Sequence, residues 1–160
     1  RESFLLFGEG LSLVSSLMTV SIVASSWLVI HSLYGNAYAG SATVLSLLSL
    51  GLVPVALGRL RNATWVAEGK QKLLLYSNLC GLISNAALNL LLIPEFGAAG
   101  AAAATALSMA IAYWFAGYFS VSTRDFAQMQ SSSFFRSINP TYACSLVRRL
   151  VRVLLSKTNS

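Results

Sequence analysis

The sequence predicts an all-α integral membrane protein with four transmembrane helices, at about residues 10–34, 40–59, 73–93 and 97–119. Hydrophobic residues make up 56% of the chain and charged residues only 10%, whereas soluble domains carry about 25% charged residues. No Lys, Arg, Asp or Glu lies between Gly10 and Gly58. Glu95 alone interrupts the stretch from Lys72 to Arg124. Uncharged blocks of this length suit a bilayer and do not suit a solvated surface.

The first predicted span, residues 10–34, is long enough to cross the hydrocarbon core with some tilt. It is rich in hydroxyl side chains, which can bond to their own helix and so are tolerated in lipid. They serve either as contacts between packed helices or as the wall of a solvated cavity. The hydroxyl residues are Ser12, Ser15, Ser16, Thr19, Ser21, Ser25, Ser26 and Ser32.

The second predicted span, residues 40–59, contains Pro54, which we expect to kink the helix because proline lacks a backbone donor. Arg59 and Arg61 are expected to end this span at its cytoplasmic mouth. They act there either as plain positive-inside signals or as cations that attract an anionic substrate group. The stretch 62–72 is expected to lie at the membrane surface.

The third predicted span, residues 73–93, carries Asn78, Asn85 and Asn89. At about 100° per residue, these asparagines fall within roughly 40° of one another on a helical wheel. An unpaired amide in hydrocarbon costs several kcal/mol, so this stripe cannot face lipid. It must face either another helix or a water-filled cavity, and the sequence leaves both possibilities open.

The fourth predicted span, residues 97–119, follows the third after a Pro-Glu-Phe-Gly turn, which predicts a helical hairpin. Its first half consists of small residues spaced by four, and such ridges let helix backbones approach closely. We therefore expect a helix-packing role for these small residues: Gly97, Gly100, Ala101, Ala104 and Thr105.

Residues 121–160 are predicted to form a basic cytoplasmic tail with an amphipathic interfacial helix at about residues 140–156. Arg148, Arg149 and Arg152 share one side of this helix and should bind anionic membrane lipids. Basic residues also follow the second span, whereas the first and third turns have none. This distribution predicts four spans with both ends of the segment in the cytoplasm. Nucleic acid is not expected as a partner of a chain embedded in lipid.

The residue pattern predicts a protein that is not an enzyme and that needs no metal or cofactor. No acid and base pair suited to catalysis is placed in a loop, and we therefore assign no catalytic residue. Cys80 and Cys144 lack metal-binding or redox spacing. The chain begins Arg-Glu-Ser, without Met, and we expect it to be a piece of a longer protein.

Three stretches carry a resemblance to a known family. They are the turn at residues 34–38, which reads Tyr-Gly-Asn-Ala-Tyr, the loop 67–70, which reads Ala-Glu-Gly-Lys, and above all the hairpin at 89–105. Over roughly residues 10–120 the chain resembles the C-terminal region of polysaccharide-biosynthesis exporters. These are the O-antigen and lipid-linked oligosaccharide flippases of the multidrug/oligosaccharidyl-lipid/polysaccharide superfamily.

The resemblance implies a two-lobed transporter bundle of about a dozen spans around a central cavity. Residues 1–120 would form the last transmembrane helices of one lobe, and the N-terminal half of the same protein would be missing. The implied function is translocation of lipid-linked oligosaccharide or polysaccharide repeat units across the bacterial cytoplasmic (inner) membrane by alternating access. Glycan polymerase or assembly proteins are further implied partners. The candidate substrate-lining residues are Asn78, Asn85, Asn89, Arg59 and Arg61.

Two other functions compete with this one. A multidrug or other ion-coupled exporter of the same fold would need a carboxylate inside the membrane, whereas Glu9 and Glu95 are expected at span ends. A membrane subunit of a glycan-assembly enzyme would need catalytic or metal-binding carboxylates, which the loops lack.

Overall fold

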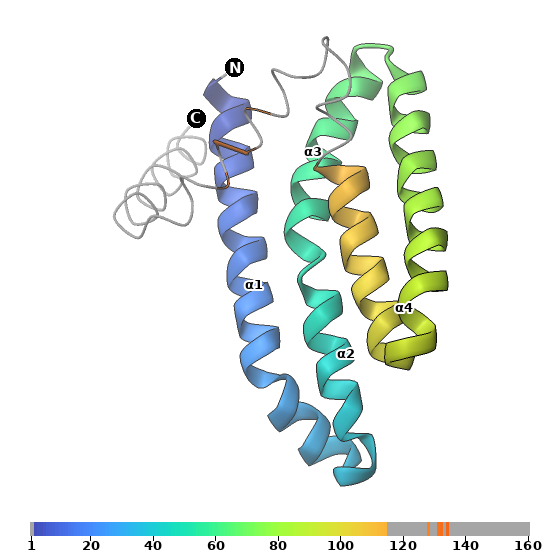
Figure 1. The fold of residues 1–160 in the computed structure, drawn as a ribbon. Coiled ribbons are helices and arrows are strands. Elements are labelled where there is room, and N and C mark those ends of the chain that lie inside the picture. Colours follow the sequence, from blue (N-terminus) through green and yellow to red (C-terminus); the bar gives the residue numbers. More distant parts are fainter. Residues whose placement is uncertain (1, 115–127, 129–130, 133, 135–160) are drawn as a thin grey trace, which may run out of the picture.

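The computed structural model describes residues 2–114, 128, 131–132 and 134, and these residues are helical apart from short turns. The helices are α1 (Glu2–Tyr34), the short 3₁₀ helix η1 (Asn36–Tyr38), α2 (Ala39–Ser49), α3 (Leu52–Ala67) and α4 (Gln71–Tyr113). Figure 1 shows α2 and α3 stacked end to end as a central column, with α1 on one side and α4 on the other. The predicted all-α membrane class is confirmed.

The turn between α1 and α2 is tight because Gly35 adopts a positive φ of 74°. A residue with a side chain rarely takes this conformation. The Gly35 amide closes the end of α1 by donating to His31 O at 3.1 Å, and the Tyr38 amide donates to Gly35 O at 3.3 Å. The chain thereby reverses direction and enters α2.

The central column is interrupted between α2 and α3, at Leu50 and Gly51. This position is explained by Pro54, which has no amide to donate to the carbonyl four residues earlier and whose ring crowds that carbonyl. The Leu50 amide instead donates to Leu47 O at 3.2 Å, and the Gly51 amide donates to Leu48 O at 3.1 Å. The break expected from Pro54 therefore occurs one turn before the proline itself.

The helix of the second predicted span continues beyond residue 59, because α3 runs as a helix to Ala67. Trp65 lies in this continuation and is only 2% exposed, so residues 62–67 are packed helix and not a separate surface segment. The helix ends at Gly69, which has a φ of 72°. The Lys70 amide donates to Trp65 O at 2.7 Å and the Gly69 amide to Val66 O at 3.1 Å, which is the Schellman arrangement of a helix C-terminus.

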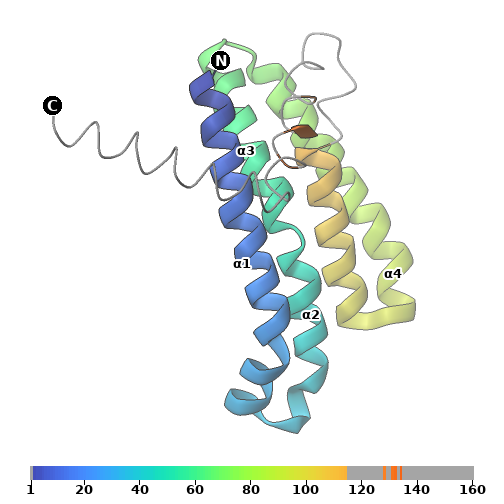
Figure 2. The same cartoon turned by 90° about the vertical axis from the view of Figure 1, so that its left-hand side faces the viewer.

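Helix α4 is a hairpin of two arms, residues 71–96 and 98–113, joined at Gly97. Gly97 has φ 56° and ψ −129°, which is not helical, and Figure 2 shows the two arms running antiparallel from this turn. The hairpin confirms the predicted reversal after Pro94. The second arm packs closely against the central column. Gly51 lies so near to Met109 of the second arm that a Cβ atom added to Gly51 would be only 2.7 Å from Met109 Sδ.

Three segments of the described chain are long and apolar enough to cross a membrane: Phe7–Tyr34, Asn36–Ala67 and Gln71–Tyr113. The last of these folds back at Gly97, so the four predicted spans correspond to α1, the α2 and α3 column, and the two arms of α4. In Figures 1 and 2 the α1–α2 turn and the hairpin turn point to one end, and the α3–α4 turn points to the other. The predicted end of the fourth span and the basic tail, including Arg148, Arg149 and Arg152, lie outside the described residues.

Replacement of Gly97 by Ala should destabilise the hairpin by about 1–3 kcal/mol, because a Cβ is strained in this backbone conformation. The matched control is Gly40→Ala in α2, where the new Cβ has open space and helical geometry. That control should be neutral or stabilising by up to about 1 kcal/mol. The free energy of unfolding in detergent micelles measures both effects. Equal values for the two variants would contradict the role of Gly97.

Candidate functional site

A chain of hydrogen bonds joins the two arms of the α4 hairpin. Asn89 Nδ2 donates to Asn85 Oδ1 at 2.9 Å, and Asn85 Nδ2 donates across the hairpin to Ser108 Oγ at 3.0 Å. Ser108 Oγ in turn donates to Thr105 O at 2.8 Å. We call the four residues Asn85, Asn89, Thr105 and Ser108 the hairpin polar chain. It places two of the predicted asparagines together in the contact between the arms.

Asn78 lies outside the hairpin polar chain and is exposed, although it shares the stripe of the helical wheel with the other two asparagines. Asn85 and Asn89 are half-buried. The Asn89 Oδ1 atom is buried and accepts no hydrogen bond from the described residues. The structure therefore gives Asn85 a partner on the neighbouring arm and leaves an acceptor on Asn89 unused.

The small residues of the second arm differ in what they contact. Gly100 is buried, and a Cβ there would overlap the carbonyl of Leu92 on the first arm. Ala104 is fully buried, while Ala101 and Thr105 are half-buried. Gly97 is exposed, has open space around its Cβ position among the described residues, and forms the turn; its packing role stays a prediction.

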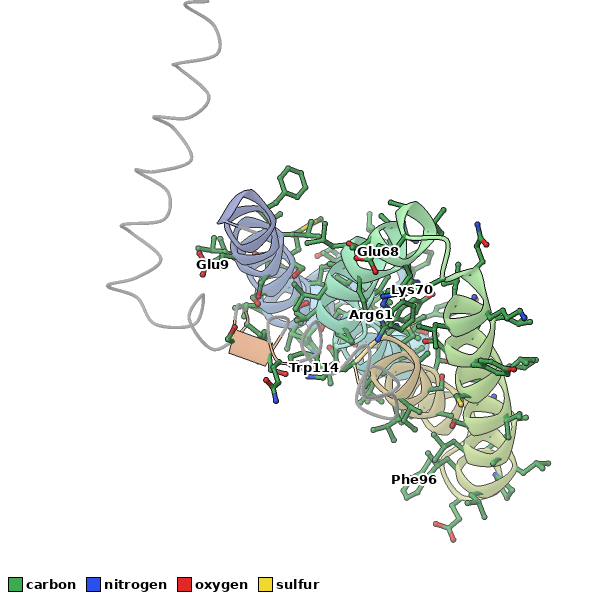
Figure 3. The ribbon with its side chains drawn as sticks, turned by 90° about the horizontal axis from the view of Figure 1, so that it is seen from above. Glu9, Arg61, Glu68, Lys70, Phe96 and Trp114 are labelled. Carbon is green, nitrogen blue, oxygen red and sulfur yellow. The ribbon has the colours of Figure 1, made fainter. Side chains whose placement is uncertain are left out.

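Arg61 is buried where α3 meets both arms of α4, with 2% of its surface exposed. Its Nη2 donates to Ser77 Oγ at 3.0 Å on the first arm and to Ala112 O at 3.1 Å on the second. Ser77 Oγ also donates to Ala112 O. The guanidinium carbon lies 4.2 Å from the ring centroid of Trp65, a cation–π geometry. We call Arg61, Ser77 and Ala112 the three-helix junction, and Figure 3 shows Arg61 between α3 and α4.

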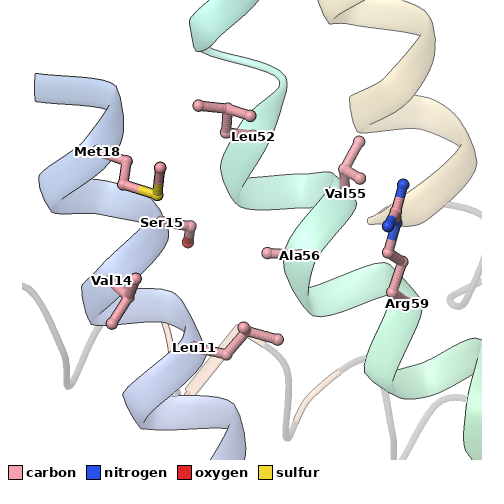
Figure 4. Close-up of a pocket in the computed structure, with 8 residues that line it drawn as sticks. All are labelled: Leu11, Val14, Ser15, Met18, Leu52, Val55, Ala56 and Arg59. Carbon is pink, nitrogen blue, oxygen red and sulfur yellow. The ribbon is translucent and has the colours of Figure 1, made fainter. Parts of the chain in front are cut away.

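Arg59 is separated from Arg61 and lines a groove between α1 and α3. Two residues along a helix correspond to about 160° around its axis, so the two arginines face different neighbours. Arg59 is exposed, and the groove beside it has a volume of about 360 Å³. Figure 4 shows the side chains that line it: Leu11, Val14, Ser15, Met18, Leu52, Val55, Ala56 and Arg59.

Four of the hydroxyl residues of α1 form a buried stripe, which was not among the sequence-based predictions. Ser12, Ser15, Thr19 and Ser26 are each at most 8% exposed. Thr19 Oγ1 lies 3.0 Å from Ser49 O, and Ser26 Oγ lies 2.8 Å from Ser46 Oγ, so the stripe packs against α2. Their spacing of three, four and seven residues is the signal that identifies one helical face. The packing interpretation of these hydroxyls therefore holds for the stripe.

Glu9 is 2% exposed and lies at the N-terminal end of the first candidate span, Phe7–Tyr34, where the sequence places it. Within the described residues, no group of three or more His, Cys, Asp or Glu side chains is arranged to hold a metal ion.

Replacement of Arg61 by Lys should cost about 2 kcal/mol of unfolding free energy. Lysine keeps the charge but lacks the planar guanidinium that binds both arms and covers Trp65. The matched control is Arg59→Lys, which lies on an exposed face and should change stability by at most about 0.5 kcal/mol. Unfolding in detergent micelles at equal insertion compares the two. The junction would lose its assigned role if both variants unfolded alike.

Comparison with known proteins identifies the family. A family model described as "Lipid II flippase MurJ" matches residues 9–157, which is nearly the whole chain. The comparisons with curated proteins and with solved structures gave no match. A flippase is a transporter and not an enzyme, in agreement with the prediction from the sequence. This match, over a chain with three segments able to cross a membrane, shows that the chain belongs to the lipid II flippase MurJ family.

Proposed function

We propose that the complete protein containing this chain translocates lipid II, a lipid-linked precursor, across the bacterial cytoplasmic membrane. The family match is the observation that carries this proposal. The multi-pass helical architecture supports it, because movement of an amphiphile across a bilayer requires membrane-spanning walls. In this proposal the present chain contributes four spans of one half, and the two halves alternate in access to the two sides.

The family match bears on which molecule the protein transports. The resemblance in the sequence implied an O-antigen or polysaccharide repeat unit, whereas the family model names lipid II. Both are lipid-linked glycans, so both present sugar hydroxyls that need hydrogen-bonding partners during passage. We favour lipid II, and the O-antigen substrate stays a prediction.

The hairpin polar chain is our candidate binding site for those sugar hydroxyls. Asn89 has a buried oxygen with no partner among the described residues, and Asn85 lies next to it. An unused acceptor of this kind is costly inside a membrane unless a ligand, water or another part of the protein meets it. Asn78, which is exposed on the same arm, could extend such a wall.

We propose different roles for Arg59 and Arg61. Arg59 is exposed and remains able to attract an anionic group at the cytoplasmic end. Arg61 already binds both arms of α4 within this chain, which favours a packing role. We further propose that both ends of the segment lie in the cytoplasm, on the basis of Lys70 and Lys72 at the α3–α4 turn and the basic tail.

An ion-coupled exporter of the same fold stays a prediction. Glu9 is almost fully buried, but it is the third residue of the candidate span Phe7–Tyr34 and takes part in an interaction within the described chain. The family match keeps lipid-linked precursor transport as the leading function.

Replacement of Asn89 by Leu should lower the rate of lipid II translocation roughly tenfold, the effect of about one lost hydrogen bond to substrate. Asn85→Leu should have a similar effect. The measurement uses the complete protein in vesicles, with fluorescent lipid II in one leaflet and equal amounts of inserted protein.

The control for this experiment is Ser108→Ala, which removes the partner of Asn85 on the second arm but leaves both asparagines in place. If the asparagines bind substrate, Ser108→Ala should translocate within about twofold of the unmodified protein, because only one neutral hydrogen bond is lost. An equal loss in all three variants would assign the asparagines to hairpin packing. Full activity of both leucine variants would remove them from the substrate path.

A further inference from the structure

The groove between α1 and α3 is separate from the hairpin polar chain. Its volume is about 360 Å³, and six of its eight lining residues are apolar. We propose that it binds one acyl chain of an anionic phospholipid from the cytoplasmic leaflet, and that Arg59 pairs with the phosphate of that lipid.

The wall of the groove selects an apolar occupant. Leu11, Met18 and Leu52 line it without polar atoms. Ser15 contributes a hydroxyl, but this hydroxyl already donates to Ser12 O at 3.1 Å on its own helix. Cavities with no unsatisfied polar group hold water poorly. Among the components of a membrane, a hydrocarbon chain matches such a wall.

The charge at the groove selects an anionic headgroup. Arg59 is the charged residue of the lining, and it is exposed. Its guanidinium can form paired hydrogen bonds with phosphate, whereas Arg61 faces α4 and is already bonded there. An apolar wall beside a cation complements an amphiphile with a negatively charged head.

The size of the groove argues against a transmembrane helix as its occupant. On α1 the lining extends from Leu11 to Met18, which is about 10 Å along a helix axis. A packed transmembrane helix would need a contact surface along much of the roughly 30 Å hydrocarbon core. The groove therefore fits part of one chain. Phospholipids with anionic headgroups are abundant in the cytoplasmic leaflet, where the basic residues of the chain are proposed to lie.

The test uses the complete protein in phosphatidylcholine vesicles that contain phosphatidylglycerol with a photoreactive group in its acyl chain. Crosslinked peptides should map to residues 11–18 and 52–56. Arg59→Gln should reduce this crosslinking roughly fivefold, the contribution of one cation near an anionic leaflet. Lys72→Gln removes an exposed cation near the α3–α4 turn and should leave crosslinking at the groove unchanged.

A second pair of variants tests the cavity itself. Ala56→Phe fills the groove and should abolish crosslinking there, whereas Ala63→Phe adds the same ring to an exposed position of α3 and should not. Equal crosslinking by a photoreactive phosphatidylcholine would overturn the role of the anionic headgroup. Displacement of the probe by polyprenyl phosphate would assign the groove to the carrier lipid of the substrate. Absence of crosslinks at the groove would show that protein covers it.

Discussion

The buried guanidinium of Arg61 is the interaction on which the arrangement of α3 and α4 depends. A cation inside a helical bundle is costly to desolvate, and the hydrogen bonds that it donates offset part of that cost. One nitrogen of Arg61 reaches a serine on the first arm of the hairpin and a backbone carbonyl on the second. The face of Trp65 covers the charge. The position of each arm relative to α3 is therefore fixed at a single point.

Two further contacts hold the arms of the hairpin together between this junction and the turn. Asn85 bonds across to Ser108 in the middle, and near the turn Gly100 allows the second arm to approach the backbone of Leu92. The chain then reverses at Gly97. Arms tied at three levels cannot easily slide past one another. If the lobe rocks during transport, we expect the hairpin to move as one unit and the movement to occur at its outer faces.

The sequence was sufficient to predict the spans and the hairpin, because uncharged length and glycine chemistry are local properties. The break before Pro54 also follows from local chemistry, since the proline acts on the carbonyl of Leu50. The burial of Arg61 is different, because it depends on Ser77 and Ala112, which are distant in the sequence. A basic residue at the expected end of a span resembles a topology signal until its partners are known. The role of Gly97 in the turn is similar, because its spacing, but not its backbone conformation, is visible in the sequence.

The two sides of the central column differ in how many of their buried polar atoms lack a hydrogen-bond partner. Among the described residues, most of the buried side-chain atoms that lack a hydrogen-bond partner are on α3 or α4: Arg61 Nε and Nη1, Trp65 Nε1 and Asn89 Oδ1. On α1 the Ser16 Oγ atom also lacks one. Hydrocarbon cannot satisfy these atoms, so water, substrate or another part of the complete protein must meet them. On the α1 side the hydroxyl stripe is bonded to its own helix and to α2, and the groove beside it is apolar. This asymmetry favours a polar path on the α4 side and a lipid-facing surface at the groove between α1 and α3.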